Sequence, residues 1–317
     1  MIQSDKKNFC LVGFGNHAKN KLLPSLEMGG HLISSIVSSK KKLKSKYIIY
    51  SCLQDALQNS DTHSHFIISS PPKAHFSQIK EILKAGRNIY VEKPIFVELD
   101  EAKNIFKNLK SNEFFVVELL MYKYTKLYEN FINIWNKKKN NCTQMECFFN
   151  IPSVNGNTFR DSKNIKSSPL YDIGCYILSL LVDLNISLEN LKIHNINIQN
   201  NKIINLCLKG VFKKMKIYAE FGMGKEYKNQ VKLKFQKDFK IVFDKFFFGV
   251  EAEKQIIFEK KNRKRIFFVK DVNGFKKIFE YSNSFWLKNQ RERFDNIIKV
   301  NQKLSILDRE VSLNNIE

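Results

Sequence analysis

Cysteine is scarce in this chain, with six residues among 317, and none of them forms a CxxC pair. Structural zinc sites and redox dithiols use closely spaced cysteines, so the sequence predicts neither of them. Scattered thiols that stay reduced are typical of cytosolic proteins. We therefore expect a cytoplasmic protein that contains no metal.

Long apolar runs are missing as well. No stretch approaches the roughly 20 apolar residues that a membrane-spanning helix needs. The start, Met1–Asn8, is polar and leads into an apolar segment that ends at Gly13, which is too short for a signal peptide. The sequence therefore predicts no membrane partner and no export.

Acidic residues are few, with 31 against 53 basic ones, which gives a formal net charge of +22. Such a charge suits nucleic acids or acidic membranes. However, lysine and asparagine occur throughout, as in the run KKKNN at 137–141, and this is the composition that an AT-rich genome encodes. Because no helix-turn-helix or stacking-aromatic pattern accompanies the charge, we expect no nucleic-acid partner.

The order of apolar patterns predicts an α/β protein with two domains, residues 1–120 and 121–317. Short apolar runs alternate with helical patterns in the first third, which is typical of a parallel sheet with crossover helices. Alternating apolar residues from about 191 to 269 predict a large open, mainly antiparallel sheet. Strands are expected at 9–12, 31–37, 47–50, 66–69, 89–91, 114–117 and 145–149, and helices at 16–27, 54–58, 75–85, 99–109, 126–135, 170–184 and 284–300.

A glycine motif, Gly13-x-Gly15-x-x-Ala18, lies between the first expected strand and the first helix. The first glycine permits a tight turn, the second lets a pyrophosphate approach the backbone, and the small Ala18 lets the helix pack on the sheet. The helix N-terminus then offers amide groups to the phosphates. The expected cofactor contacts of this turn are Gly13, Phe14, Gly15, Asn16, His17 and Ala18.

The end of the second expected strand bears on cofactor choice. NAD-binding domains usually place a carboxylate there, about 20 residues after the glycines, to hold the ribose hydroxyls. This chain instead has Ser38-Ser39-Lys40, followed by two more lysines. Hydroxyl and ammonium groups suit a 2′-phosphate, so the sequence predicts NADP(H) in preference to NAD(H).

Polar residues follow the next two strands, at the edge where open α/β sheets gather ligands. Ser69, Ser70, Pro71 and His75 come after one strand, and Glu92-Lys93-Pro94 comes after the other. We expect cofactor contacts from these serines, Pro71, His75, Glu92 and Lys93. A lysine at such a position can also stabilise charge that develops on a substrate oxygen.

These pieces together resemble the glucose-fructose oxidoreductase/inositol dehydrogenase (Gfo/Idh/MocA) family. The resemblance rests on PPKAH and ILKAGRNIYVEKPI within 66–102, on the glycine turn, on 118–124, and on DIGCY at 172–176. It extends over nearly the whole chain. It implies a Rossmann domain that binds NAD(P), followed by an α+β domain that binds substrate and forms a homo-oligomer through its sheet.

The resemblance also implies roles for single residues. Lys93 corresponds to the family's catalytic lysine, and Tyr176 and Asp172 lie four positions apart, where one helix would place both on one face. The tyrosine, where many members have histidine, is similar to the branch that contains nucleotide-sugar ketoreductases. A phenol can donate a proton to a nascent alkoxide. Tyr122 and Arg160 are the further expected substrate contacts.

We therefore expect an NAD(P)-dependent oxidoreductase that transfers a hydride to or from a sugar or nucleotide-sugar carbonyl or hydroxyl, such as a 3-ketoreductase. The turn 221–229 resembles one found in ketoreductases of nucleotide-linked keto-deoxysugars. The alternatives are a dehydrogenase of a free sugar or cyclitol, and a catalytically silent cofactor-binding regulator. The second is raised by Lys166-Ser167-Ser168-Pro169, which stands where the family commonly has a glycine-rich run.

Overall fold

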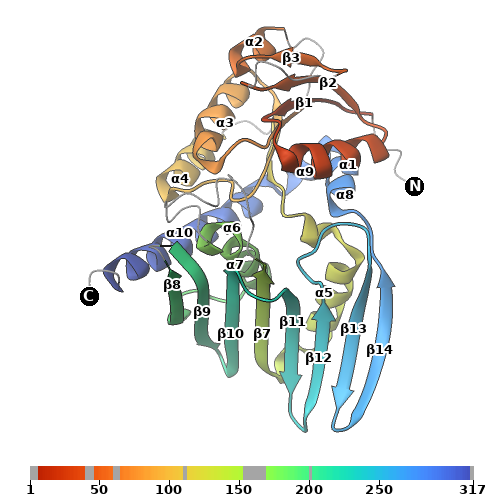
Figure 1. Cartoon of the computed structure of the whole chain (residues 1–317), viewed down its shortest axis with the longest axis vertical. Helices are drawn as coiled ribbons and strands as arrows, with labels where there is room; N and C mark the ends of the chain where they lie inside the picture. Colours follow the sequence, from red (N-terminus) through yellow and green to blue (C-terminus); the bar gives the residue numbers. More distant parts are fainter. Residues whose placement is uncertain are drawn as a thin grey trace. The chain divides into compact units, whose positions relative to one another are not determined.

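The computed structural model describes residues 6–39, 46–59, 65–109, 113–152, 169–199 and 202–314. The chain divides into two compact units (Figure 1). The first comprises Met1–Met121 and Phe275–Asp295, and the second comprises Tyr122–Gly274 and Asn296–Glu317. Segments far apart in the sequence thus build the first unit. Within the described part of the chain, no helix has both the length and the apolarity to cross a membrane.

The first unit contains a parallel sheet whose six described strands have the order β3-β2-β1-β4-β5-β6. The chain reverses its direction of progress at β1, because β2 and β3 lie on one side of it and β4 on the other. Open α/β sheets bind ligands outside the carboxyl ends of the strands at such a switch point. The strands are β1 (Asn8–Val12), β2 (Leu32–Val37), β3 (Ile48–Tyr50), β4 (His65–Ile68), β5 (Asn88–Val91) and β6 (Val116–Glu118).

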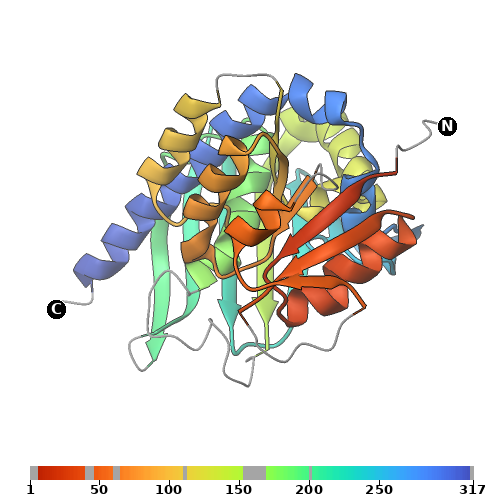
Figure 2. The ribbon, with the colours of Figure 1, turned by 90° about the horizontal axis from the view of Figure 1, so that it is seen from above.

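The helices before residue 110 follow the predicted positions closely, whereas the single helix predicted over 284–300 is divided into α9 (Asn283–Lys288) and α10 (Gln290–Asn314). Helix α3 ends just before Gly86, which adopts a φ of +69° and caps the helix. Helix α4 begins with a reciprocal capping box between Glu98 and Glu101. Figure 2 shows α3 and α4 side by side. The helical elements are η1 (Ala18–Leu22), α1 (Leu23–Met28), α2 (Leu53–Gln58), η2 (Pro72–Ala74), α3 (His75–Lys84), α4 (Leu99–Asn108), α8 (Gly274–Glu280) and α9 (Asn283–Lys288).

Aromatic rings from α8 and α9 complete the core of the first unit. Phe279 packs against Phe9 and Tyr90, with ring centroids 5.5 and 5.3 Å apart. Trp286 packs against Tyr90 at 6.2 Å. The buried ammonium of Lys7 donates to the Tyr90 hydroxyl and to the carbonyl oxygens of Phe279 and Tyr281. Helix α8 was not expected from the sequence, and these contacts explain how the segment is held.

The second unit contains a sheet with the order β14-β13-β12-β11-β7-β10-β9-β8. All its neighbouring strands are antiparallel except β7 and β10, which are parallel. The prediction of a large, mainly antiparallel sheet is therefore confirmed. The strands are β7 (Cys142–Ile151), β8 (Lys192–Gln199), β9 (Lys202–Phe212), β10 (Met215–Met223), β11 (Lys228–Phe235), β12 (Phe239–Asp244), β13 (Glu253–Lys260) and β14 (Arg263–Lys270).

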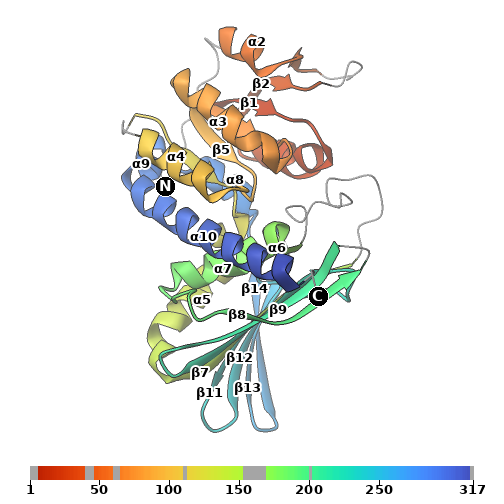
Figure 3. The ribbon, with the colours of Figure 1, turned by 90° about the vertical axis from the view of Figure 1, so that its left-hand side faces the viewer.

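Helices α5, α6 and α7 lie on one face of this sheet (Figure 3). The strands turn their apolar side chains, such as Phe149 and Phe221, toward these helices, and their opposite face is largely polar. Helix α7 is buried along almost its whole length, as its apolar sequence requires. The helical elements are η3 (Met121–Tyr124), α5 (Lys126–Lys138), η4 (Lys139–Asn141), α6 (Pro169–Asp172), α7 (Gly174–Asp183) and α10 (Gln290–Asn314), which begins in the first unit.

The expected single helix over 170–184 is interrupted. Helix α6 ends at Asp172, Ile173 has a φ of −116°, and α7 starts at Gly174. An added Cβ on Gly174 would lie 2.9 Å from the ring of Phe221, so the glycine permits close packing at the interruption. Local periodicity does not reveal this break, because it depends on a strand distant in sequence.

Candidate active site

The glycine turn after β1 is built by close backbone contact with the end of β4. Gly13 has a φ of +89°, and a Cβ placed there would lie 2.7 Å from the Ser70 amide nitrogen. Only glycine fits such a position without strain. Gly15 differs, since an added Cβ would meet nothing within 4 Å. Ala18 is fully buried under the turn. The open space at Gly15 is what a bound pyrophosphate requires.

The first helical turn after these glycines presents polar groups. Asn16 and His17 are exposed, and Phe14 is half-buried with the Lys19 ammonium 5.2 Å from its ring centre. The Lys19 amide donates to the Gly15 carbonyl, so the helix starts immediately after the glycines. A helix start directed at the strand ends offers amides and a positive dipole to an anion.

The end of β4 is fixed by side chains of α3. The Ser70 hydroxyl donates to Oε1 of Gln78 at 2.6 Å. His75 is fully buried, with Nε2 2.9 Å from the Ser70 carbonyl and Nδ1 3.1 Å from the Pro94 carbonyl. Burial lowers the pKa of His75, and the Ser70 and Pro94 carbonyls oppose this by raising it. His75 therefore braces the ends of β4 and β5, while Ser69 and the exposed Pro71 complete this edge.

The end of β5 places Glu92 and Lys93 at the same edge of the sheet. Oε1 of Glu92 lies 2.8 Å from Nε2 of His17, so an element after β1 contacts an element after β5. Oε2 of Glu92 accepts from the Lys93 amide at 3.3 Å. The Glu118 carboxylate, at the end of β6, accepts from the Ile95 amide at 3.1 Å. The loop that carries Lys93 is thus held on both sides by carboxylates.

Ser38 and Ser39 follow β2, as predicted. The Ser38 amide donates to the Tyr50 carbonyl at 3.0 Å, and Ser39 is exposed. Lys40, expected beside them, lies outside the described residues, as do Arg160 and positions 166–168 of the altered loop.

The second unit holds the other expected catalytic residues. Asp172 and Tyr176 are 2% and 4% exposed and flank the interruption between α6 and α7. The Tyr176 amide donates to the Ile173 carbonyl at 3.1 Å. Because the two residues belong to different helices, the interruption rather than a continuous helical face sets their relative position.

Aromatic rings surround Tyr176. Its ring lies 5.3 Å from that of Phe149, 5.7 Å from Tyr122 and 6.2 Å from Phe247. Tyr122, expected to contact substrate, is fully buried and donates from its hydroxyl to the Tyr176 carbonyl at 3.2 Å. Burial raises the pKa of Tyr122 well above its usual value. Tyr122 therefore remains a neutral donor that supports the backbone of α7.

A polar cleft of about 460 Å³ opens in the second unit beside the turn 223–228. The central residue of this cleft is Glu220. Its carboxylate accepts from the Asn150 amide group and the Lys225 ammonium at 3.0 Å each, and from the Tyr218 hydroxyl at 2.9 Å. The wall also includes Tyr227, which is 46% exposed. Sequence reasoning noted this turn through its resemblance to ketoreductases but did not identify Glu220 or Asn150, which lie on neighbouring strands.

The sequence predicts that the protein contains no metal. Among the described residues, no group of three histidine, cysteine or carboxylate side chains could hold a metal ion. His65 is buried on β4, and its Nε2 lies 3.0 Å from Oδ1 of Asn283. Sequence reasoning also missed Gln78 and Glu118. The position of Gln78 in the helix after β4 and the position of Glu118 at the end of a strand are the only sequence signals that could have indicated them.

Residues 7–119 match the family model of the GFO_IDH_MocA oxidoreductases with an NAD-binding Rossmann fold. The structure is similar to that of KijD10, a 3-ketoreductase from Actinomadura kijaniata in complex with NADP and TDP-benzene. The identity is 14% and the TM-score 0.83, and 96% of this chain and 97% of that chain are covered. The structure is also similar to that of a Gfo/Idh/MocA family oxidoreductase from Vibrio cholerae. Here the identity is 13% and the TM-score 0.74, and 98% of this chain and 100% of that chain are covered. No curated protein sequence matches the chain significantly.

The family match and the parallel sheet with its glycine turn indicate an oxidoreductase with an NAD-binding Rossmann domain. More specifically, residues 7–119 match the Gfo/Idh/MocA family model, as the sequence predicts, and the chain has the fold of the solved structures of KijD10 and of the Vibrio cholerae oxidoreductase. These findings support an NAD(P)-dependent oxidoreductase.

Proposed function

We propose that this protein transfers a hydride between NADP(H) and the carbonyl or hydroxyl carbon of a sugar or nucleotide sugar, in the manner of a 3-ketoreductase. The observation that carries the proposal is the turn at Gly13 and Gly15. It lies at the switch point of a parallel sheet and has open space where a pyrophosphate would approach. The similarity to KijD10, solved with NADP and TDP-benzene, supports the substrate class.

We assign separate roles in the hydride transfer to the cofactor, Lys93, Tyr176 and Asp172. The nicotinamide cofactor, when bound, supplies or accepts the hydride. The Lys93 ammonium polarises the substrate oxygen, and the Tyr176 phenol donates a proton to it during reduction. Asp172 supports the start of α7, the helix that contains Tyr176. In the oxidative direction, the phenolate form of Tyr176 accepts the same proton.

The choice of NADP over NAD is a proposal that rests on the end of β2. Ser38 and Ser39 stand where an NAD-binding domain usually has a carboxylate, which would repel a 2′-phosphate. KijD10 was solved with NADP, which is consistent with this choice. Lys40 would add a positive charge beside these serines.

The test is turnover with a panel of 3-keto nucleotide sugars, free keto sugars and cyclitols, followed by the absorbance of NADPH or NADP. We expect Tyr176→Phe and Lys93→Met to lower kcat by about 100- to 10,000-fold while NADPH affinity changes little. Tyr171→Phe is the matched control, since Tyr171 is equally buried and its hydroxyl contacts Asp308 at 3.2 Å. Full activity of Tyr176→Phe would refute the assigned role. NADPH binding without turnover on any substrate would favour the regulator.

We further propose a cytoplasmic homo-oligomer that associates through the polar face of the second unit's sheet. The six free thiols suit a reducing compartment. Strand β14, at one edge of the sheet, exposes Phe268 by 60% beside Gln255 of β13, which suits a protein contact. Sedimentation analysis of the wild-type protein and of Phe268→Lys tests this. A monomer at all concentrations would refute it.

A further inference from the structure

The wall behind Tyr176 includes the ring of Phe247, which is the middle one of three consecutive phenylalanines in the segment Phe246–Phe248 after β12. Phe246 and Phe247 are 0% and 1% exposed. The Phe247 ring packs against Tyr176 and also against Tyr122 and Phe149, with ring centroids 5.2 Å apart for Tyr122 and 5.3 Å apart for Phe149. The position of the Tyr176 ring therefore depends on where this segment is held.

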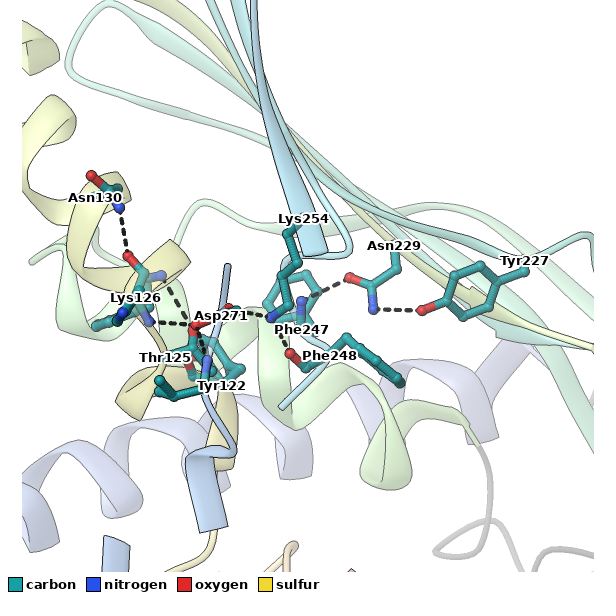
Figure 4. Close-up of polar contacts among 12 residues, drawn as sticks. Tyr122, Thr125, Lys126, Asn130, Tyr227, Asn229, Phe247, Phe248, Lys254 and Asp271 are labelled. Carbon is teal, nitrogen blue, oxygen red and sulfur yellow. Dashed lines mark hydrogen bonds and ion pairs between the residues drawn. The ribbon is translucent and has the colours of Figure 1, made fainter. Parts of the chain in front are cut away.

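One side of the segment is held by Asn229 of β11, which is 2% exposed (Figure 4). Its side-chain oxygen accepts from the Phe247 amide at 2.7 Å, and its backbone oxygen accepts from the Phe246 amide at 3.2 Å. Its side-chain nitrogen donates to the Tyr227 hydroxyl at 3.1 Å. Tyr227 lines the polar cleft, so Asn229 joins the cleft wall to the wall behind Tyr176.

The other side is held by a buried ion pair. The Lys254 ammonium donates to the Phe248 carbonyl and lies 2.7 Å from Oδ2 of Asp271, with both side chains fully buried. Burial lowers the pKa of Lys254, and Asp271 opposes this. Two charges buried without solvent are costly unless they serve several partners.

Asp271 has further partners that lead back to Tyr176. Its Oδ1 accepts from the Lys126 amide at 2.6 Å, at the start of α5, and from the Val272 amide at 2.9 Å. Thr125, the N-cap of α5, donates to the Tyr122 carbonyl at 2.8 Å. Tyr122 in turn donates to the Tyr176 carbonyl. Figure 4 shows this chain of contacts from Asn229 to Tyr122.

We propose that Asn229 and the Lys254–Asp271 pair are positioning residues for the phenol of Tyr176. Asn229 accepts from the Phe246 and Phe247 amides, and Lys254 donates to the Phe248 carbonyl. Asp271 accepts from the Lys126 amide and so holds the turn that contains Tyr122. The inference rests on the proposed function, since it concerns the residue that donates the proton. Proton transfer is sensitive to small misplacements of the donor, so loosening this wall lowers the rate of the chemical step more than the binding of substrate.

The first test compares Asn229→Leu with Asn229→Asp. Leucine removes the acceptor of the Phe247 amide, whereas aspartate keeps an oxygen there and can accept from the Tyr227 hydroxyl. We expect Asn229→Leu to lower kcat by about 10- to 100-fold with KM within about threefold, and Asn229→Asp to recover most of the rate. Asn301→Leu is the matched control. Asn301 is also buried and donates to the Ile297 carbonyl at 3.0 Å within α10, and its loss is expected to leave kcat unchanged.

The second test uses the double variant Lys254→Met/Asp271→Asn. It removes both charges, so no uncompensated buried charge is left, and asparagine keeps an oxygen for the Lys126 amide. We expect this variant to fold and to show the same loss in kcat as Asn229→Leu. Wild-type kcat in both the double variant and Asn229→Leu would overturn the proposal and leave these residues with a purely structural role.

A third readout does not depend on turnover. In protein labelled with ¹³C-tyrosine, the Tyr176 resonance can be assigned by its absence in Tyr176→Phe. We expect it to shift or broaden in Asn229→Leu and to remain unchanged in Asn301→Leu. An unchanged resonance in Asn229→Leu overturns the positioning role. If the wild-type protein turns over no substrate but the resonance responds as expected, the proposed function fails while the positioning of Tyr176 stands.

Discussion

The same substitution at the two glycines of the dinucleotide turn should have different effects, on stability at Gly13 and on cofactor affinity at Gly15. In Gly13→Ala, the methyl group meets the Ser70 amide nitrogen at 2.7 Å and the Ser69 carbonyl carbon at 2.9 Å, and both neighbours are backbone atoms that cannot rotate away. The positive φ adds about 1–2 kcal/mol, and overpacking adds about 1–3 kcal/mol. We therefore expect the first unit to lose about 2–5 kcal/mol of its free energy of unfolding.

Gly15→Ala should leave stability unchanged, because its added methyl group has no neighbour within 4 Å and the glycine has no positive φ. The methyl group would instead occupy the space where the pyrophosphate approaches. We expect NADPH affinity to fall about tenfold or more, which corresponds to about 1.4 kcal/mol or more of binding free energy. One substitution thus tests the fold, and the other tests the cofactor position.

Urea unfolding followed by tryptophan fluorescence measures the first effect. The chain has two tryptophans, and Trp286 is buried in the first unit while Trp135 lies in the second. In a Trp135→Phe background, the signal reports the first unit alone. NADPH fluorescence titration measures the second effect. A wild-type unfolding midpoint for Gly13→Ala would refute the close backbone approach, and wild-type NADPH affinity for Gly15→Ala would refute the placement of the pyrophosphate.

Three further changes test other parts of the first unit. Lys7→Met removes the shared donor of two buried oxygen atoms and one partly buried oxygen atom, so we expect the free energy of unfolding to fall by about 1–3 kcal/mol and hydrogen exchange over residues 275–281 to become faster. Burial lowers the pKa of His31 and His65 to about 4, against 6.5 when unfolded, so protons bind the unfolded chain preferentially and stability should fall as pH drops from about 6.5 toward 4. His65→Gln should flatten this dependence in urea unfolding at several pH values, and an unaltered slope would contradict the assignment. Ser39→Asp should weaken NADPH binding about tenfold relative to NADH through repulsion of the 2′-phosphate, and an unchanged ratio would exclude that contact.

Much of the first unit could be predicted from local patterns. Apolar runs of strand length, the glycines at 13 and 15 and the cap at Gly86 each act over a few residues, so periodicity and turn chemistry reveal them. The positions of Lys93 and Ser70 followed from a topological rule, since the carboxyl ends of parallel strands share one edge.

The remaining features depend on contacts between distant residues. The interruption at Ile173 depends on the close packing of Gly174 against Phe221 of β10. The engagement of both His75 nitrogens by carbonyl oxygens depends on a loop 19 residues away. No local pattern distinguishes a histidine that braces two strands from one that faces a ligand. The same is true of Asn229, whose partner amide lies 18 residues further along.

The packing of Phe279 and Trp286 against Phe9 and Tyr90 has a consequence for biosynthesis. A ribosome makes the six parallel strands early, but the rings that cover one apolar side of them emerge only after nearly the whole polypeptide has been made. Until then, those surfaces stay exposed, and Lys7 lacks two of its carbonyl partners. A fragment that stops at residue 121 should consequently aggregate or recruit chaperones, whereas one extended with residues 275–295 through a short linker should fold.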